Sequence, residues 1–162
     1  MSAERVFVGL GANLGDAQTT LAAALQELAG LRDTRLVAVS SFYRSAPVQA
    51  QGPDFVNAVA ELATTLEPPA LLQALQEIEQ IHGRERPYHH APRTLDLDLL
   101  LYGQRVVHEA GLTLPHPRLH ERAFVLQPLR ELAPELVMPG LGTVAAWAAC
   151  ATGQPIEKLS AE

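Results

Sequence analysis

The sequence predicts an α+β domain of ferredoxin-like type, in which helices pack on one face of a mainly antiparallel sheet. Two observations carry this prediction. Strand-like and helix-like segments follow one another as strand, helix, strand, strand, helix, strand. The length of 162 residues and the hydrophobic fraction of 48% suit one compact globule with a single core. We therefore expect residues 1–162 to form one domain.

The first strand is expected at residues 5–10, which are apolar and rich in Val and Phe. The glycine-rich residues 9–16 predict a tight turn after it. Asn13 or Asp16 can cap the following helix, which is expected to end near Gly30 because glycine commonly terminates helices.

Residues 34–43 and 55–66 predict the second and third strands, separated by a loop with Pro and Gly. Pro68 then begins a helix in which apolar residues recur at helical spacing, and Gly83 ends it. A polar, irregular segment follows.

The fourth strand is expected at residues 94–102, with residues 105–108 as its hairpin partner after a Gly-Gln turn. Beyond residue 111 prolines recur, which predicts only short elements there. Residues 143–151 predict a last short helix.

The composition excludes several functional classes. The net charge of −6 disfavours general nucleic-acid binding, which needs a broad basic surface. No apolar stretch is long enough to span a bilayer, and the N-terminus lacks the pattern of a signal peptide. The single cysteine, Cys150, fits a reducing compartment. We expect a cytoplasmic monomer.

The fourth strand carries two carboxylates. Side chains on a strand alternate between its faces, so Asp96 and Asp98 share one face. The opposite face is expected to hold Leu95, Leu97, Leu99 and Leu101. Two carboxylates held this close favour a bound cation, and hard oxygen ligands suit Mg²⁺. The alternative is an edge strand with ordinary solvated aspartates.

Three arginines bracket the loop before this strand: Arg84, Arg86 and Arg93. A metal ion between carboxylates and phosphate oxygens, with arginines on the remaining oxygens, is typical of phosphoryl transfer. A surface loop with solvated arginines is the alternative.

Asn57 is a polar residue in an apolar strand, on the same face as Phe55. An aromatic ring beside an amide is a suitable seat for a planar heterocycle. A structural Asn that bonds a neighbouring loop fits the spacing equally well.

Two further patterns give only weak support for a binding site. The glycines at 9, 11 and 15 do not have the spacing of a dinucleotide-binding turn. His116 and His120 are four residues apart, but prolines flank His116, which disfavours a helical zinc site. His116 alone could bond a phosphate or an adenine ring.

With these residues assembled, the chain resembles the 6-hydroxymethyl-7,8-dihydropterin pyrophosphokinase family. The most specific block is Pro92-Arg93-Thr94-Leu95-Asp96-Leu97-Asp98-Leu99. Further blocks follow in the family's order over nearly the whole length, at residues 9–15, 41–47, 54–59, 78–79, 83–86 and 114–126.

The resemblance implies transfer of pyrophosphate from ATP to the pterin hydroxymethyl group, with release of AMP. It implies two Mg²⁺ ions bridged by Asp96 and Asp98, and assigns catalysis to these two residues together with Arg84 and Arg93. The positions that match the ATP site are Glu79, Arg84, Arg86, Arg93, Leu99, Thr113, His116 and Arg122. Those that match the pterin pocket are Ser45, Ala46, Val48, Phe55, Asn57 and Phe124.

Two other classes place comparable features on a ferredoxin-like sheet. A nucleotidyl cyclase-like or polymerase-like Mg²⁺ enzyme also uses two carboxylates, but the Phe55–Asn57 pair and the Arg93 block disfavour it. An RNA-recognition sheet is disfavoured by the acidic charge and by the lack of aromatic residues on adjacent strands. As a single domain, the chain is expected to have one activity and two small-molecule substrates.

Overall fold

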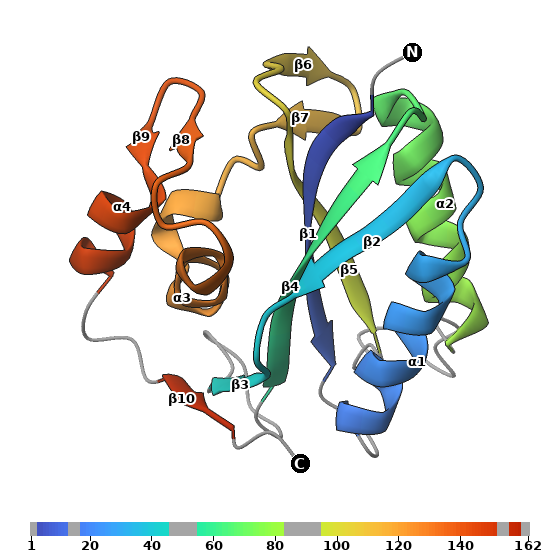
Figure 1. The fold of residues 1–162 in the computed structure, drawn as a ribbon, viewed down its shortest axis with the longest axis horizontal. Helices are drawn as coiled ribbons and strands as arrows, with labels where there is room; N and C mark the ends of the chain where they lie inside the picture. The colour runs from blue at the N-terminus through green and yellow to red at the C-terminus, as the bar shows by residue number, and fades with distance from the viewer. Residues whose placement is uncertain (1–2, 13–16, 46–54, 83–94, 152–155, 160–162) are drawn as a thin grey trace.

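A six-stranded sheet forms the centre of the molecule (Figure 1). The computed structural model describes residues 3–12, 17–45, 55–82, 95–151 and 156–159. The strands of the central sheet are β1 (Glu4–Ala12), β2 (Thr34–Val39), β3 (Tyr43–Ser45), β4 (Phe55–Thr64), β5 (Asp96–Tyr102) and β10 (Ile156–Lys158). They lie in the order β10-β3-β4-β1-β5, and β2 also pairs with β4, next to β3.

In the described part of the chain, four helices and two small hairpins surround this sheet. The helices are α1 (Ala17–Ala29), α2 (Pro68–Ile81), α3 (Ala123–Leu132) and α4 (Val144–Cys150), and η1 (Leu119–Glu121) is a short 3₁₀ turn. The hairpins pair β6 (Val107–Glu109) with β7 (Leu112–Leu114), and β8 (Val137–Met138) with β9 (Gly142–Thr143). Within the described part of the chain, no helix has the length and hydropathy that a membrane crossing requires.

The strand order confirms the predicted ferredoxin-like topology. In the unit β1–α1–β2, strand β4 lies between the two strands, and in the unit β4–α2–β5, strand β1 does. The two units therefore interlock, and every pairing among the described strands is antiparallel.

Helix α2 shows how the sequence forms these elements. Pro68 stands at its start, where a missing N–H is no loss and the fixed φ favours the helix. Leu71, Leu75 and Ile78 recur at helical spacing and are buried. They join apolar residues of α1 and of one face of the sheet in a first core, which includes Val6, Val8, Leu10, Leu21, Ala24, Leu28, Leu97 and Leu99.

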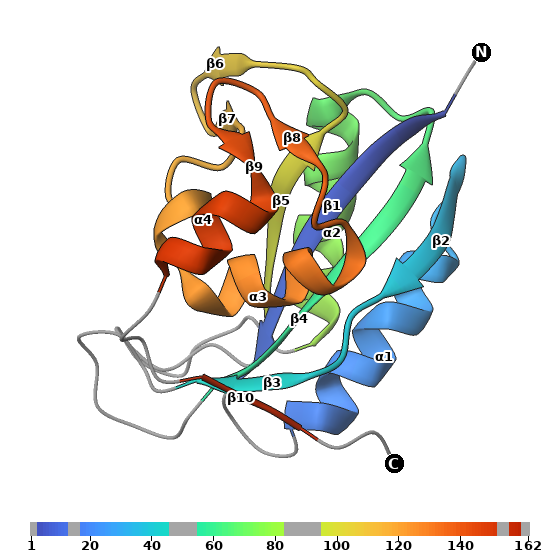
Figure 2. The same ribbon diagram turned by 60° about the vertical axis from the view of Figure 1, so that its left-hand side comes forward.

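The expectation that the helices cover one face is wrong, because α3 and α4 cover the other (Figures 1 and 2). A second core there contains Phe7, Val59, Leu100, Leu101, Val125, Leu126, Leu129, Val144 and Ala148. Sequence reasoning missed α3 because Pro128 lies inside it. Proline costs an interior helical position about 3 kcal/mol. Burial of Leu126 and Leu129 against the sheet offsets that cost.

Two predicted strand boundaries also differ. Residues 34–43 form two strands because the chain breaks at Ser40, whose hydroxyl accepts the backbone N–H of Val59 at 2.9 Å. The first strand extends beyond residue 10 to Ala12, since β4 and β5 pair with it on both sides. Gly9 and Gly11 therefore lie inside a strand and not in a turn.

The predicted hairpin partner of the fourth strand is wrong as well. Residues 107–109 pair with β7, and the chain turns away from β5 at Gly103, whose φ is +52°. Leu112 and Leu114 are buried and supply the apolar partner strand for this small hairpin.

Strand β5 contains a β-bulge at Leu100. Val8 of β1 pairs with Leu99, but its neighbour Phe7, one residue earlier in β1, pairs with Leu101. Leu100 is therefore left without a partner on β1. The extra residue reverses the alternation of side chains beyond it. Leu101 therefore enters the second core, against the prediction that it shares a face with Leu95, Leu97 and Leu99.

Candidate active site

Asp96 and Asp98 lie on the sheet face that α3 covers. Their neighbours Leu95, Leu97 and Leu99 enter the opposite core, beneath α1 and α2. Both aspartates are half-buried. Residues two apart on a strand are separated by roughly 7 Å, so the two carboxylates can act on one group of ligands. Asp96 and Asp98 thus share a face, as the sequence predicted.

Glycine separates these carboxylates from the next polar residue across the sheet. Gly11 pairs with Asp96 on one side and with Asn57 on the other, and Gly9 pairs with Asp98. A Cβ atom on Gly11 would come within 3.1 Å of Asn57 Nδ2. The two glycines therefore form a floor without side chains between the carboxylates and Asn57.

Asn57 is buried and held by β3. Its Oδ1 accepts a hydrogen bond from Ser45 Oγ at 2.7 Å, and both residues are buried. Its Nδ2 lies on the side of Gly11. Phe55, two residues before Asn57 in β4, lies on the same face and is half-buried. Asn57 thus makes the bond to a neighbouring segment that the structural interpretation required, and its other amide atom lies toward the glycine floor.

His116 lies along the outer side of β5. Its backbone N–H donates to Leu100 O at 2.9 Å, and its Nδ1 accepts from Arg118 N–H at 3.2 Å. Burial lowers the pKa of His116, the charges of Arg122 and Arg118 lower it further, and the carboxylate of Asp98 acts in the opposite direction. The imidazole is therefore neutral at pH 7 with its proton on Nε2, which makes it a donor toward a ligand.

Arg122 and Phe124 lie at the start of α3. The Arg122 guanidinium carbon is 5.4 Å from the centroid of the Phe124 ring, a cation–π distance. Phe124 itself packs at the margin of the second core. Arg122 directly precedes the helix, and Phe124 is in its first turn.

Glu79 and Leu99 belong to the other face of the sheet. Glu79 is only 5% exposed, and its Oε2 accepts the backbone N–H of Leu97 at 2.8 Å. The side chain of Leu99 lies in the first core, so only its backbone can meet a ligand at the edge of β5. Thr113 is half-buried in β7 and pairs with His108.

The predicted site residues thus separate into two sets around the carboxylates. Of the described residues that the resemblance links to ATP, Glu79 lies on α2 and bonds β5, Leu99 lies in β5, and Thr113, His116 and Arg122 lie in the chain that follows it. Those linked to the pterin lie on β3, β4 and α3. Five predicted residues lie outside the described part of the chain: Arg84, Arg86, Arg93, Ala46 and Val48.

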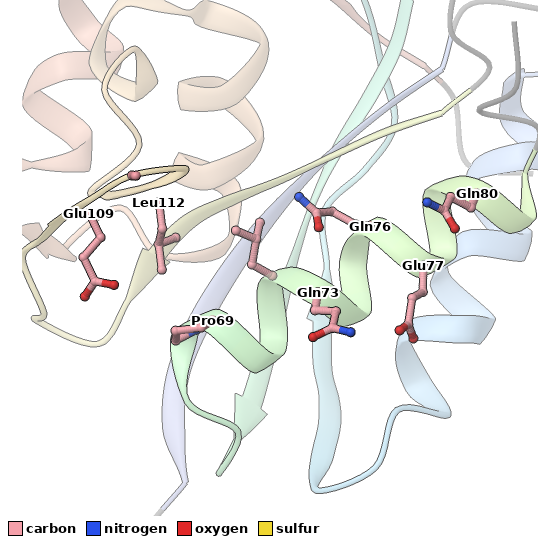
Figure 3. A pocket seen from close by; sticks show the side chains of 9 residues that line it. Pro69, Gln73, Gln76, Glu77, Gln80, Glu109 and Leu112 are labelled. Atoms are coloured by element: carbon pink, nitrogen blue, oxygen red, sulfur yellow. The ribbon is translucent and has the colours of Figure 1, made fainter.

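A groove of about 520 Å³ opens elsewhere, between α2 and the turn of the β6–β7 hairpin (Figure 3). Gln73, Gln76 and Glu77 line it from α2, and Glu109 and Leu112 from the hairpin. None of the described site residues belongs to it. Among the described residues, no group of three or more His, Cys, Asp or Glu side chains could by itself hold a metal ion. An ion at Asp96 and Asp98 would need further oxygens, from water or a phosphate.

Sequence reasoning missed the role of Gly9 and Gly11. The sequence predicts a turn at these glycines, and the signal that could have identified their role is their spacing. Two glycines two residues apart within an apolar strand leave one face bare, which indicates a close approach by a ligand or another chain segment.

Comparisons with known proteins agree with one another. The profile of a family described as 7,8-dihydro-6-hydroxymethylpterin-pyrophosphokinase (HPPK) matches residues 7–134. A 2-amino-4-hydroxy-6-hydroxymethyldihydropteridine pyrophosphokinase of Pseudomonas aeruginosa is 49% identical over 137 residues, which cover 84% of this chain and 85% of that protein. The protein of the same name from Haemophilus influenzae is 47% identical over 134 residues, with coverages of 82% and 84%.

The fold comparison gives a similar answer at low sequence identity. The crystal structure of wild-type Plasmodium falciparum HPPK-DHPS with pteroate superposes with a TM-score of 0.76 at 12% identity. The match covers 93% of this chain but 45% of that longer chain. At this identity the likeness supports the fold alone.

Proposed function

Since the chain belongs to the 7,8-dihydro-6-hydroxymethylpterin-pyrophosphokinase family, we propose that it transfers the pyrophosphoryl group of ATP to the hydroxymethyl group of 6-hydroxymethyl-7,8-dihydropterin. This diphosphokinase reaction belongs to folate biosynthesis and releases AMP. The observation that carries the proposal at the level of the site is the row Asp96–Gly11–Asn57 across the sheet. In this row the Asp96 carboxylate, with Asp98 beside it, lies on one side of Gly11, and the buried Asn57 amide lies on the other.

Asp96 and Asp98 are the proposed metal ligands. Carboxylate oxygens in a half-exposed position suit Mg²⁺, which keeps several waters and takes its remaining ligands from substrate phosphates. When bound, Mg²⁺ neutralises charge on the phosphate oxygens, and we propose two ions.

ATP is proposed to bind along the outer edge of β5. His116 would donate from Nε2, and Arg122 would supply positive charge near the phosphates. Glu79, Leu99 and Thr113 would also contribute to the ATP site. Arg84, Arg86 and Arg93, which precede β5 in the chain, would contact the triphosphate, and Arg84 and Arg93 would support the transition state.

The pterin is proposed to bind among the side chains of β3, β4 and the first turn of α3. Asn57, held by Ser45, would read the polar edge of the ring through its amide. Phe55 and Phe124 would stack on the two ring faces. Ala46 and Val48 would complete the pocket. In this arrangement the hydroxymethyl oxygen attacks the β-phosphorus in line and gives up its proton to water. The bond from the β-phosphorus to the oxygen shared with the α-phosphorus breaks, and AMP leaves with that oxygen.

Both cores share the central sheet, which supports a single pyrophosphokinase domain over residues 1–162. We also propose that this domain acts as a monomer in the cytoplasm. Its partners are the two small-molecule substrates, without nucleic acid or membrane.

The deciding experiment is incubation with ATP, Mg²⁺ and the hydroxymethylpterin, with quantification of AMP and ADP. We expect AMP in equal amount to the pterin consumed. Asp98→Ala should lower turnover by roughly a hundredfold or more and leave the circular dichroism spectrum unchanged. Glu109→Ala, which removes an exposed carboxylate in the groove of Figure 3, is the matched control and should retain turnover.

Each alternative has its own outcome in this assay. ADP as the product would indicate an ordinary kinase. AMP or pyrophosphate released without pterin would favour the cyclase-like or polymerase-like reaction. Full turnover by Asp98→Ala would reject the metal-binding role of that carboxylate.

A further inference from the structure

One carboxylate near the end of α3 holds the connection between β2 and β3. Glu131 Oε2 accepts hydrogen bonds from the backbone N–H of Ser41 at 2.9 Å and from Ser41 Oγ at 3.0 Å. Glu131 Oε1 accepts from the hydroxyl of Tyr43 at 2.8 Å. The three bonds join residues about ninety positions apart in the sequence, so they fix two elements that no local signal connects.

Both tethered elements lead to the proposed pterin pocket. Tyr43 pairs with Asn57 across the β3–β4 ladder, and two residues later Ser45 donates its hydroxyl to Asn57. At the other end of the same helix, α3 carries Phe124 in its first turn. The tether therefore links the strand that positions Asn57 to the helix that positions Phe124.

The electrostatics agree with a tight contact. Burial acts to raise the pKa of Glu131, but the hydrogen bonds from Ser41 and Tyr43 and the charge of Lys158 outweigh it, so the pKa is lowered. Burial and the contact with Glu131 raise the pKa of Tyr43 to about 12. Glu131 is thus charged and Tyr43 neutral at pH 7, which is the state in which the phenol donates.

The helix does not need this tether to stay on the sheet. Val125, Leu126 and Leu129 hold α3 in the second core. The segment before β3 has its own anchor on β4, through Ser40. What the three hydrogen bonds add is the lateral spacing between α3 and β3, since apolar contacts are not directional.

We infer that Glu131 is a positioning residue for the acceptor pocket, which sets the distance between the Phe124 wall on α3 and the Ser45–Asn57 wall on β3. The inference rests on the proposed function in that the pocket between these walls takes the pterin. Glu131 does not contact the substrate, and its effect passes through Tyr43 and Ser41.

The test compares KM values for the two substrates in variants of the whole chain. Glu131→Ala should raise the KM for the pterin about tenfold, since hydrogen bonds to a charged group are lost. The KM for ATP should change by less than about twofold, because that site lies on the far side of the carboxylates. Glu131→Gln should stay within about threefold of wild type, because its amide oxygen still accepts from Ser41.

Two further variants complete the set. Tyr43→Phe removes one of the three bonds and should give an intermediate rise in the pterin KM, which also carries the test if Glu131→Ala fails to fold. The double variant should match Glu131→Ala, because the two residues act as one unit. Glu135→Ala, an exposed carboxylate beyond the end of α3, is the control and should leave both KM values unchanged.

Hydrogen exchange of residues 41–45 shows whether loss of the Glu131 bonds loosens the segment that leads into β3. Faster exchange in Glu131→Ala together with a higher pterin KM supports the inference. Faster exchange with an unchanged pterin KM, or an equal rise in both KM values, overturns it and leaves the proposed function intact. If the wild-type chain forms no AMP in the presence of the pterin, the proposed function fails and the inference fails with it.

Discussion

At the scale of single residues, the bare floor between Asp96 and Asn57 depends on Gly11. Its strand conformation is open to any residue, because its φ is not among the positive values. What excludes a side chain is the 3.1 Å approach of a Cβ atom to Asn57 Nδ2. Glycine is therefore favoured at this position by the space beside Asn57 and not by the backbone conformation.

Gly11→Ala should raise the KM for the pterin by about five- to tenfold with little change in thermal stability. The new methyl group displaces the Asn57 amide by a few tenths of an ångström and weakens its hydrogen bonds. Steady-state kinetics at saturating ATP measure this effect. Gly9→Ala is the comparison, because the atoms nearest to its Cβ belong to the flexible side chain of Leu100, the first at 3.4 Å, and its effect should be smaller. Equal effects of the two substitutions would contradict this account.

Residue patterns predicted part of the site and missed part of it. Period-two alternation predicted correctly that Asp96 and Asp98 share a face, because alternation is a local rule. Neither the bond from Ser45 to Asn57 nor the tether from Glu131 to Tyr43 has such a local signal. These contacts depend on how distant elements meet, which no short window of sequence contains.

At the scale of elements, periodic helices were predicted well and interrupted ones poorly. The apolar spacing of α2 predicted its extent from Pro68 to near Gly83. Helix α3 was missed because Pro128 is a strong local signal against a helix. Tertiary burial of its apolar face decides the outcome. The split of β2 from β3 had no signal either, since Ser40 breaks the ladder through a side-chain bond to β4.

The tether between α3 and β3 should make stability depend on pH in the acid range. The pKa of Glu131 lies below its ordinary value of 4.5, so its charged form is favoured in the folded state. That contribution is complete above the ordinary value and is lost as the pH falls through the lowered one. Urea unfolding of wild type and Glu131→Gln should therefore show a stability difference at pH 7 that shrinks progressively below about pH 4.5. A difference that stays constant across this range would contradict the assignment.

At the scale of the whole molecule, one sheet joins two cores. β1 contributes Val6 and Val8 to the core under α1 and α2, and Phe7 to the core under α3 and α4. The order of strands and helices predicted the interlocked topology, because antiparallel strands linked by helices have few arrangements. In the second layer, α4 agrees with the short helix predicted at residues 143–151, whereas α3 was not predicted, because prolines recur after the last long strand.

Because the cores share strands, the chain should unfold in one transition. Trp147, the only tryptophan, packs against the second core, so its fluorescence reports on that side of the sheet. Far-UV circular dichroism reports on all helices and strands. The two signals should give the same urea midpoint. An earlier loss of Trp147 fluorescence would indicate that the layer of α3 and α4 unfolds by itself.

The bulge at Leu100 gives the run Leu99-Leu100-Leu101 a meaning beyond hydrophobicity. The extra residue changes which face of the sheet the following side chains of β5 occupy. Before the bulge, Asp96 and Asp98 face α3. After it, Tyr102 faces the opposite core, where its hydroxyl donates to Leu66 O. Deletion of one leucine would remove the bulge, so Asp96 and Asp98 could no longer face α3 while Tyr102 faces the opposite core. The length of this run therefore determines which side chains of β5 face α3.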